Sequence, residues 1–321
     1  MSLKIAIFGA TSQIARDLIL SFSNQGNCNL FLFARRPDVV VSWLEHHGLL
    51  HKFPVAGFDS FNAARQFDCI INFVGSGNPA QVMAMGASIF DVTLSYDEMV
   101  LDYLHHHPAC RYLFLSSGAA YCSSFSEPVD ETSKAEIPIN NIKPSDWYAV
   151  AKLHAECRHR SLRHLSIVDI RIFNYFSHTQ DISARFFITD ILRAIRAGET
   201  LITSASNIVR DYIGPMDFSN LVSLILDAPS INIVIDSYTR SPIDKLTLLS
   251  EMRRQFGLKY DVTEMPADIS ATGNKLNYFS RNRRAEIFGY APSYTSLETV
   301  LNEARLYFSY EDKINFRHSK N

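Results

Sequence analysis

The fold is decided by residues 5–16, which read Ile-Ala-Ile-Phe-Gly-Ala-Thr-Ser-Gln-Ile-Ala-Arg. Four apolar residues lead into Gly9, and a helix-compatible stretch begins at Ser12. A buried strand that turns sharply into a helix is typical of a dinucleotide-binding loop, because phosphate oxygens meet backbone N–H groups at the helix N-terminus. We therefore expect this opening turn to hold a pyrophosphate.

Small residues occupy the three positions of this loop where glycine is usual, namely Gly9, Ser12 and Ala15. Only the first is glycine, so the loop is a degenerate Gly-x-x-Gly-x-x-Gly pattern, and a merely tight strand-to-helix turn is the alternative. The Ser12 hydroxyl can donate to a phosphate, and Ala15 allows close helix packing. The cofactor contacts expected here are Gly9, Thr11, Ser12, Gln13 and Ile14.

Further apolar runs at residues 30–33, 69–74, 112–115 and 167–173 are separated by helix-compatible stretches, of which 79–106 and 145–164 are the longest after the first. This alternation predicts an α/β fold, a doubly wound parallel sheet of the Rossmann type. After residue 174 the rhythm changes, which predicts a smaller, discontinuous C-terminal α/β lobe. The expected division is residues 1–176 plus about 208–240 for the dinucleotide-binding domain, and 177–207 plus 241–321 for the lobe.

The composition excludes several classes of protein. Of the 321 residues 47% are hydrophobic, so the chain is neither disordered nor a coiled coil. Its formal charge is only −2, which gives no electrostatic reason to expect a nucleic-acid partner. No apolar run approaches the ~18 residues of a membrane span. The five cysteines are widely spread without zinc-type spacing, so we expect no metal site, reduced thiols and a cytoplasmic location.

Basic residues follow the second predicted strand. A carboxylate there would accept hydrogen bonds from the ribose 2′-OH of NAD, whereas a guanidinium pairs with the 2′-phosphate of NADP. The sequence has Arg35 and Arg36, which favour NADP over NAD, although Asp38 lies nearby and the arginines could simply mark an exposed strand end.

Residues after the next two strands are further candidates for cofactor contacts. Asp59 could accept a hydrogen bond from the adenine amino group. Phe73, Val74 and Gly75 end the fourth strand with backbone that could pass beside the cofactor. Each could also be purely structural.

A strand ending in two serines, Ser116 and Ser117, is followed by a helix that carries Tyr148 and Lys152. Positions four apart share a helix face, so the phenol and the ammonium can point into one cleft. An adjacent ammonium favours the phenolate and should lower the pKa of Tyr148 from its usual value of about 10. The pair alone is weak evidence, but its place after the phosphate loop and the serine-ended strand strengthens it.

In this order of motifs the sequence resembles the extended short-chain dehydrogenase/reductase family, in its nucleotide-sugar epimerase, dehydratase and reductase branch. The resemblance spans almost the entire chain. Residues 171–175 resemble the family's Arg-x-Phe-Asn segment, residues 210–213 its Arg-Asp-Tyr/Phe segment, and residues 288–292 its Leu-Gly-Trp-x-Pro element.

The resemblance implies three catalytic residues. Ser117 would hydrogen-bond the reacting substrate oxygen, with a slip to Ser116 left open. Tyr148 would be the acid/base, and Lys152 would hold the nicotinamide ribose while lowering the pKa of the tyrosine.

The resemblance also implies that the C-terminal α/β lobe binds the substrate, and it implies two substrate contacts. Asn174 would face the substrate, and Arg210 would pair with its diphosphate, because a guanidinium fork suits paired phosphate oxygens. The alternative for Arg210 is a structural ion pair with Asp211 or another carboxylate. The family's usual four-helix interface would here make a homodimer through residues 79–106 and 145–164.

Departures from the family narrow the expected reaction. Family dehydratases have an Asp-Glu pair where this chain has Gly118 and Ala119, so dehydration is disfavoured. Cys122 lies beyond the position where related enzymes use a cysteine. We therefore expect reduction of a 4-keto nucleotide sugar. The alternatives are a nucleotide-sugar C4 epimerase, reduction of a neutral ketone, and a non-catalytic NADP-binding sensor or scaffold.

Overall fold

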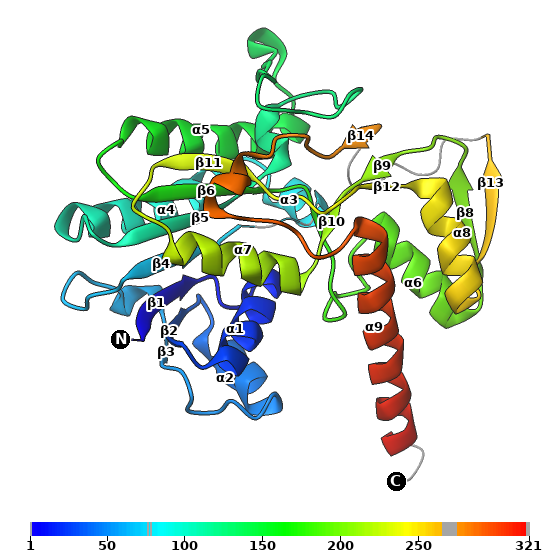
Figure 1. Cartoon of the computed structure of the whole chain (residues 1–321), viewed down its shortest axis with the longest axis horizontal. Helices are drawn as coiled ribbons and strands as arrows, with labels where there is room; N and C mark the ends of the chain where they lie inside the picture. Colours follow the sequence, from blue (N-terminus) through cyan, green and yellow to red (C-terminus); the bar gives the residue numbers. More distant parts are fainter. Residues whose placement is uncertain (1, 76, 78, 265–274, 319–321) are drawn as a thin grey trace.

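A seven-stranded parallel sheet forms the centre of the computed structural model, which describes residues 2–75, 77, 79–264 and 275–318 (Figure 1). The strand order is β11-β6-β5-β4-β1-β2-β3. The strands are β1 (Leu3–Phe8), β2 (Cys28–Phe33), β3 (Val55–Ala56), β4 (Cys69–Asn72), β5 (Arg111–Ser117), β6 (Ile167–Ile172) and β11 (Ile233–Asp236). The order reverses between β1 and β4, and doubly wound sheets bind ligands at that point, beyond the carboxyl ends of the strands. This confirms the predicted Rossmann-type fold.

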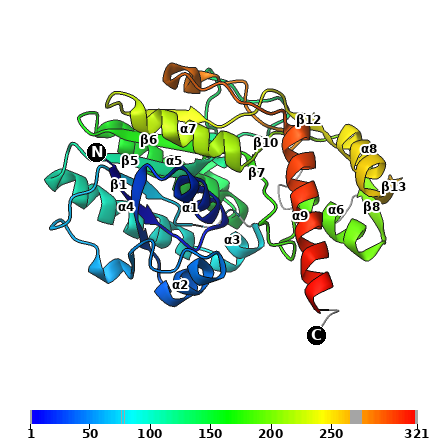
Figure 2. The same cartoon turned by 60° about the horizontal axis from the view of Figure 1, so that its bottom comes forward.

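Helices cover both faces of the sheet because its strands are apolar on both sides. In β1, Ile5 and Ile7 pack into one core cluster, whereas Ala6 and Phe8 pack into the other. The first cluster lies under α1 (Gln13–Gln25), α2 (Pro37–His46) and α7 (Pro215–Asp227). The second lies under α4 (Ser88–His106) and α5 (Trp147–Ser161), as Figure 2 shows from another side.

The long helix expected over residues 79–106 is interrupted. It forms α3 (Pro79–Met85) and α4, with Gly86 between them at a φ of +53°. A positive φ does not fit a right-handed helix, and glycine adopts it without a steric penalty. Gly86 therefore ends α3 and lets α4 start in a new direction.

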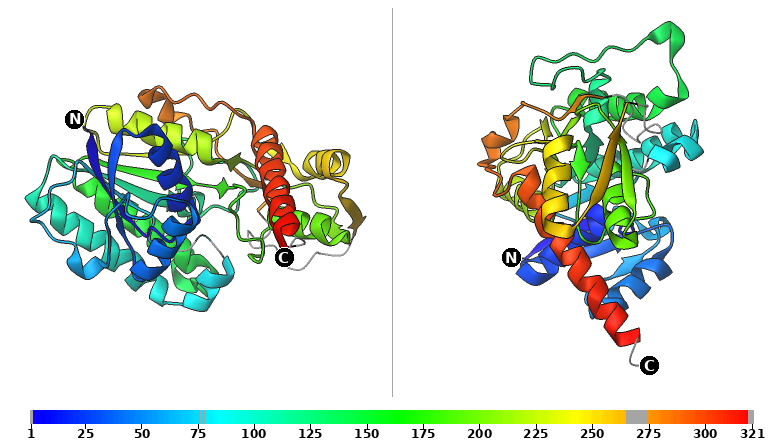
Figure 3. Two further views of the ribbon diagram at one scale, coloured as in Figure 1. Left: turned by 90° about the horizontal axis from the view of Figure 1, so that it is seen from below. Right: turned by 90° about the vertical axis from the view of Figure 1, so that its right-hand side faces the viewer.

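A smaller lobe lies beside the sheet and contains α6 (Phe187–Ala197), α8 (Lys245–Phe256) and α9 (Ser296–His318) (Figure 3). Its strands β8 (Thr200–Ser204) and β13 (Lys259–Thr263) pair in parallel. Short strands lie between the lobe and the main sheet: β7 (Asn174–Tyr175) with β10 (Tyr212–Ile213), and β12 (Ile243–Asp244) with β9 (Val209–Arg210) and β14 (Asn277–Tyr278).

The end of the chain returns to the main domain before α9. Ala285, Phe288 and Tyr290 pack into the core cluster beneath α7. We therefore propose the expected division of the chain with one change: this segment belongs with the dinucleotide-type domain rather than with the lobe. No helix among the described residues is long and apolar enough to cross a membrane.

Candidate active site

The β1–α1 turn passes close to the end of β4. Gly9 has a φ of +78°, and its N–H donates to the carbonyl of Phe33 over 2.9 Å. A Cβ at Gly9 would lie 3.0 Å from backbone atoms of Phe73 and Val74. Only glycine fits this approach, so three of the expected cofactor residues meet at the switch point of the sheet.

The first turn of α1 has the form of an anion cradle. Ser12 is the N-cap of the helix, in extended conformation, and its hydroxyl makes no capping hydrogen bond. The N–H groups of the first turn and this hydroxyl therefore fit a pyrophosphate. Thr11 is exposed beside them, and Ile14 packs against the core. Gln13 differs, because its amide donates to the Ser177 hydroxyl over 2.8 Å and ties α1 to the chain after β7.

The candidate adenosine contacts lie at the carboxyl ends of β2 and β3. Arg35 and Arg36 are exposed, and neither side chain makes a hydrogen bond or ion pair within the described residues. Asp38, in the first turn of α2, and Asp59, after β3, are exposed as well. These groups are accessible to a ribose and a base.

Lys152 is buried on α5 at the carboxyl end of β5. Its Nζ donates to the carbonyl of Leu115 over 2.7 Å and lies 4.3 Å from the centroid of the Phe114 ring. Burial lowers the pKa of Lys152 to about 8, and more distant carboxylates only partly oppose this. A Cβ at Gly75 would lie 3.8 Å from Nζ. The end of β4 and the ammonium therefore border the same space.

Ser117 lies between two phenols. Its hydroxyl acts on the pKa of the nearby Tyr148 phenol and lies 3.4 Å from the phenolic oxygen of Tyr278. Ser116 points elsewhere and donates to Glu156 over 2.5 Å. The two serine side chains therefore have different partners, and Ser117 rather than Ser116 lies beside Tyr148.

The expected acidification of Tyr148 is not found in the folded chain. Burial raises the pKa of Tyr148, and the nearby Ser117 hydroxyl opposes this rise. The ammonium of Lys152 is instead engaged by the Leu115 carbonyl. The expectation was therefore wrong for the protein on its own, where the phenol is a proton donor at neutral pH.

The two expected substrate residues have different surroundings. The Asn174 amide donates to the carbonyls of Asp211 and Tyr278, at 3.2 and 3.5 Å, so it ties β7 to β10 and β14. Arg210 is buried, with its Cζ 6.0 Å from the Tyr278 ring centroid. The Asp211 carboxylate accepts hydrogen bonds from Thr239 and Ser296, so Asp211 is not the carboxylate that pairs with Arg210.

A polar network that the sequence does not predict holds α5 against β6. Glu156 forms a bidentate pair with Arg171, with one N···O distance of 2.6 Å. Arg171 also lies 3.5 Å from Asp236, which accepts from Tyr121 and Ser280. The arginine of the Arg-x-Phe-Asn segment is thus structural. Nothing local in the sequence indicates this pairing, because its members come from α5, β6 and β11.

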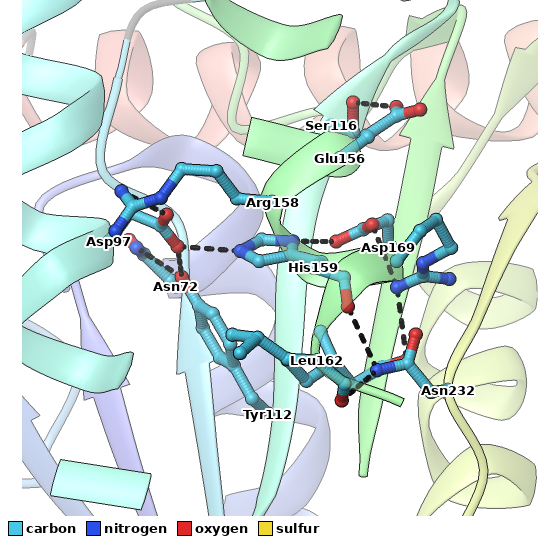
Figure 4. Close-up of polar contacts among 12 residues, drawn as sticks. Asn72, Asp97, Tyr112, Ser116, Glu156, Arg158, His159, Leu162, Asp169 and Asn232 are labelled. Atoms are coloured by element: carbon cyan, nitrogen blue, oxygen red, sulfur yellow. Dashed lines mark hydrogen bonds and ion pairs between the residues drawn. The ribbon is translucent and has the colours of Figure 1, made fainter. Parts of the chain in front are cut away.

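A second buried cluster surrounds His159 of α5 (Figure 4). Its Nε2 lies 2.7 Å from Asp97 of α4, and its Nδ1 lies 2.6 Å from Asp169 of β6. Burial lowers the pKa of His159, but the two carboxylates outweigh this and raise it to about 9. The imidazole is therefore charged at neutral pH.

This cluster reaches the candidate cofactor loop through a chain of hydrogen bonds. The Tyr112 hydroxyl donates to Asp97 over 3.0 Å, and Asn72 donates to Tyr112 over 2.9 Å. The Asn72 Oδ1 atom accepts a hydrogen bond from the N–H of Val74 over 2.9 Å. The cluster thus fixes the backbone that faces Gly9.

His159→Gln should destabilise the fold by about 3–5 kcal/mol at pH 6, because it breaks a buried charge cluster. The folded pKa of about 9 exceeds the unfolded value of about 6.5, so this stabilisation is complete below about pH 6.5 and is lost as the pH rises through about 9. Urea unfolding of wild type and variant across this range measures the difference. His154→Gln, at an exposed position on the same helix, is the control. A pH-independent difference would contradict the assigned charge.

A Rossmann-type sheet with this glycine turn and this serine, tyrosine and lysine group defines the extended short-chain dehydrogenase/reductase class. A family model described as the NAD dependent epimerase/dehydratase family matches residues 5–235, and the chain belongs to this family. A comparison of the sequence with curated proteins found no match.

Solved structures of similar fold include UDP-glucose-4-epimerase from Stenotrophomonas maltophila with bound NAD and formylated UDP-arabinopyranose. It is 15% identical, with a TM-score of 0.79 over 97% of this chain and 99% of that chain. UDP-glucose 4-epimerase from Thermotoga maritima, with UDP-glucose, is 15% identical, with a TM-score of 0.76 over 96% of this chain and 99% of that chain. UDP-glucuronic acid 4-epimerase from Bacillus cereus, with UDP-glucuronic acid and NAD, is 14% identical, with a TM-score of 0.73 over 96% of this chain and 99% of that chain.

Proposed function

We propose that this protein interconverts or reduces a nucleotide sugar at C4, using a nicotinamide dinucleotide held by the β1–α1 turn. The observation that carries the proposal is that the Ser117 and Tyr148 hydroxyls lie near each other at the carboxyl edge of the sheet. The β1–α1 turn at Gly9 and the Lys152 ammonium lie at the same edge. When bound, the nicotinamide supplies hydride exchange. The residues Gly9, Ser12, Val74 and the end of β4 would hold it.

The chain's own groups divide the remaining work. Ser117 orients the sugar oxygen by hydrogen bonding, and Tyr148 exchanges a proton with that oxygen. The raised pKa of Tyr148 suits proton donation to a carbonyl, and an ammonium at Lys152 lowers the cost of the reverse transfer. The intact geometry of all three residues argues against a non-catalytic sensor.

Packing at Gly118 supports the exclusion of dehydration. A Cβ there would lie 2.5 Å from ring atoms of Phe173, which is buried and packs edge-to-face against Phe125 and at a tilt against Tyr278. An acidic side chain at this position has no room. A reaction that needs the dehydratase acid pair is therefore not supported.

Gly118→Ala should lower the free energy of unfolding by about 1–3 kcal/mol, because the added methyl overpacks a rigid aromatic cluster. Urea unfolding measures the loss. The double variant Gly118→Ala/Phe173→Leu should recover part of it by making room. A single variant as stable as wild type would show that the Phe173 ring can move and would reopen the question of dehydration.

Between the two reactions that remain, we favour C4 epimerisation with NAD. The NAD-dependent family and the NAD complexes of similar fold support this choice, and the sequence-based preference for NADP has no support from them. Reduction of a 4-keto sugar with NADPH is the second candidate, because Arg35 and Arg36 are accessible at the ribose position.

Native mass spectrometry of the purified protein separates these candidates. An epimerase needs no net redox change and should retain NAD through purification. Protein that emerges empty and then binds NADPH in preference to NADH would overturn epimerisation in favour of reduction. Protein that binds neither dinucleotide would overturn the proposed function altogether.

A further inference from the structure

Tyr278 brings a hydroxyl from the C-terminal part of the chain to Ser117. Its phenolic oxygen lies 3.4 Å from the Ser117 Oγ atom, and the side chain is buried. Burial raises the pKa of Tyr278 above its ordinary value, and the Ser117 hydroxyl and Arg210 only partly oppose this rise. The phenol therefore keeps its proton at neutral pH and is available as a hydrogen-bond donor.

The surrounding structure holds the Tyr278 ring in place. The ring packs edge-to-face against Phe125 and at a tilt against Phe173, with centroids 4.8 and 5.3 Å away. The Nζ atom of Lys275 lies 4.6 Å from its centroid. The backbone of β14 is fixed as well, because the N–H of Asn277 donates to the carbonyl of Phe125 over 2.8 Å. The phenolic oxygen is therefore held in one position before a substrate binds.

The donor and acceptor positions of the Ser117 hydroxyl decide the direction of its contact with Tyr278. A serine hydroxyl donates one hydrogen bond and accepts up to two. The Ser117 oxygen already accepts from the N–H of Ala119 over 3.2 Å, which leaves one acceptor position. In the part of the chain that the structure describes, the Tyr278 hydroxyl has no other acceptor within hydrogen-bonding distance. Donation from Ser117 to Tyr278 would leave a buried O–H unsatisfied, which costs free energy, so Tyr278 is the donor.

We propose that Tyr278 is a positioning residue, which donates to Ser117 and thereby directs the single Ser117 proton toward the sugar oxygen that exchanges a proton with Tyr148. This inference rests on the proposed function. The two acceptor positions of the Ser117 oxygen are then occupied from the protein side, and its proton points toward the space beside the Tyr148 phenol. A donor that is oriented before the reaction needs no reorganisation when charge develops on the substrate oxygen. Tyr278 thus acts on the reaction through Ser117.

Initial rates test the proposal, with UDP-glucose or UDP-glucuronic acid and NAD, or with a 4-keto nucleotide sugar and NADPH. Tyr278→Phe keeps the ring and its packing but removes the donor. The value of kcat should therefore fall by about 3- to 10-fold, as the loss of one neutral hydrogen bond predicts. The KM for the nucleotide sugar and the affinity for the dinucleotide should stay within about twofold of wild type, because the lost bond acts only on the orientation of the Ser117 proton.

A double-mutant cycle with Ser117 distinguishes this role from a purely structural one. Ser117→Ala removes the acceptor, and kcat should fall by about 10²–10³-fold, as for other preorganised donors. Adding Tyr278→Phe to Ser117→Ala should lower kcat by less than about twofold more, because no hydroxyl is left to orient. Ser117→Thr keeps a hydroxyl at this position, and in that background Tyr278→Phe should again have its full effect.

Tyr290→Phe is the matched control, because Tyr290 is a buried tyrosine of the C-terminal part of the chain that donates to the carbonyl of Tyr238. It should lower the Tm and leave kcat unchanged. The inference alone is overturned if Tyr278→Phe leaves kcat unchanged, or if it lowers kcat equally in wild type and in Ser117→Ala. A wild-type protein that converts none of these nucleotide sugars would overturn the inference together with the proposed function.

Discussion

Tyr148→Phe is expected to lower the turnover of the nucleotide sugar by about 10²–10⁴-fold, the usual contribution of a positioned acid/base. The change removes the phenolic oxygen, which lies near the Ser117 hydroxyl, and keeps the ring. Affinity for the dinucleotide should therefore stay close to that of wild type. Initial rates and an NAD titration measure the two quantities separately.

Tyr103→Phe provides the control for this prediction. Tyr103 is a buried tyrosine whose hydroxyl accepts from the N–H of Phe67 and donates to the carbonyl of Arg65. Its loss should reduce stability and leave turnover unchanged. If Tyr148→Phe keeps full turnover, Tyr148 has no part in the chemistry.

Gly9→Ala is expected to have the largest effect on cofactor binding. The new methyl would meet backbone atoms of Phe73 and Val74 at 3.0 Å, and backbone cannot rotate away as a flexible side chain can. The positive φ adds about 1–2 kcal/mol of strain. The turn must therefore open, and NAD affinity should fall by at least about tenfold.

Gly26→Ala is the control that separates the effect of the steric clash from the effect of the positive φ. Gly26 has a similar φ of +70° at the end of α1, but a Cβ there would meet nothing within 4 Å. This variant should lose only the strain energy and keep its NAD affinity, as thermal unfolding and fluorescence titration can show. Equal losses of affinity in the two variants would mean that the β1–α1 turn does not hold the cofactor.

The parts of the site that the sequence predicts are those fixed by local geometry. The β1–α1 turn passes so close to the backbone after β4 that position 9 must be glycine. In the sequence this constraint is visible as a glycine between an apolar strand and a helix. Tyr148 and Lys152 share a face because they are one helical turn apart. The strand order follows from the alternation of apolar runs and helices, which allows few topologies.

The parts that the sequence does not predict depend on contacts between distant segments. Tyr278 reaches Ser117 from a position 161 residues away, through the short strand β14, and no local pattern marks it. His159 acquires its charge only when α4, α5 and β6 pack together.

The pKa of Tyr148 shows the same limit. Spacing places a lysine one turn away, but only the folded structure shows that Leu115 accepts the hydrogen bond from that lysine. Spacing therefore predicts which groups are near each other, whereas burial and hydrogen-bond partners decide their charge.

The central claim is that the sugar carbon exchanges a hydride while Tyr148 moves a proton on the attached oxygen. Running the reaction in D₂O, with UDP-glucose or UDP-glucuronic acid for epimerisation or with a 4-keto nucleotide sugar and NADPH for reduction, and examining the recovered sugars by NMR, tests it directly. Because a hydride does not exchange with water, the account predicts no solvent deuterium at the reacting carbon, whether the reaction is epimerisation or reduction. Deuterium at that carbon would show that a proton is removed there and would contradict the assignment.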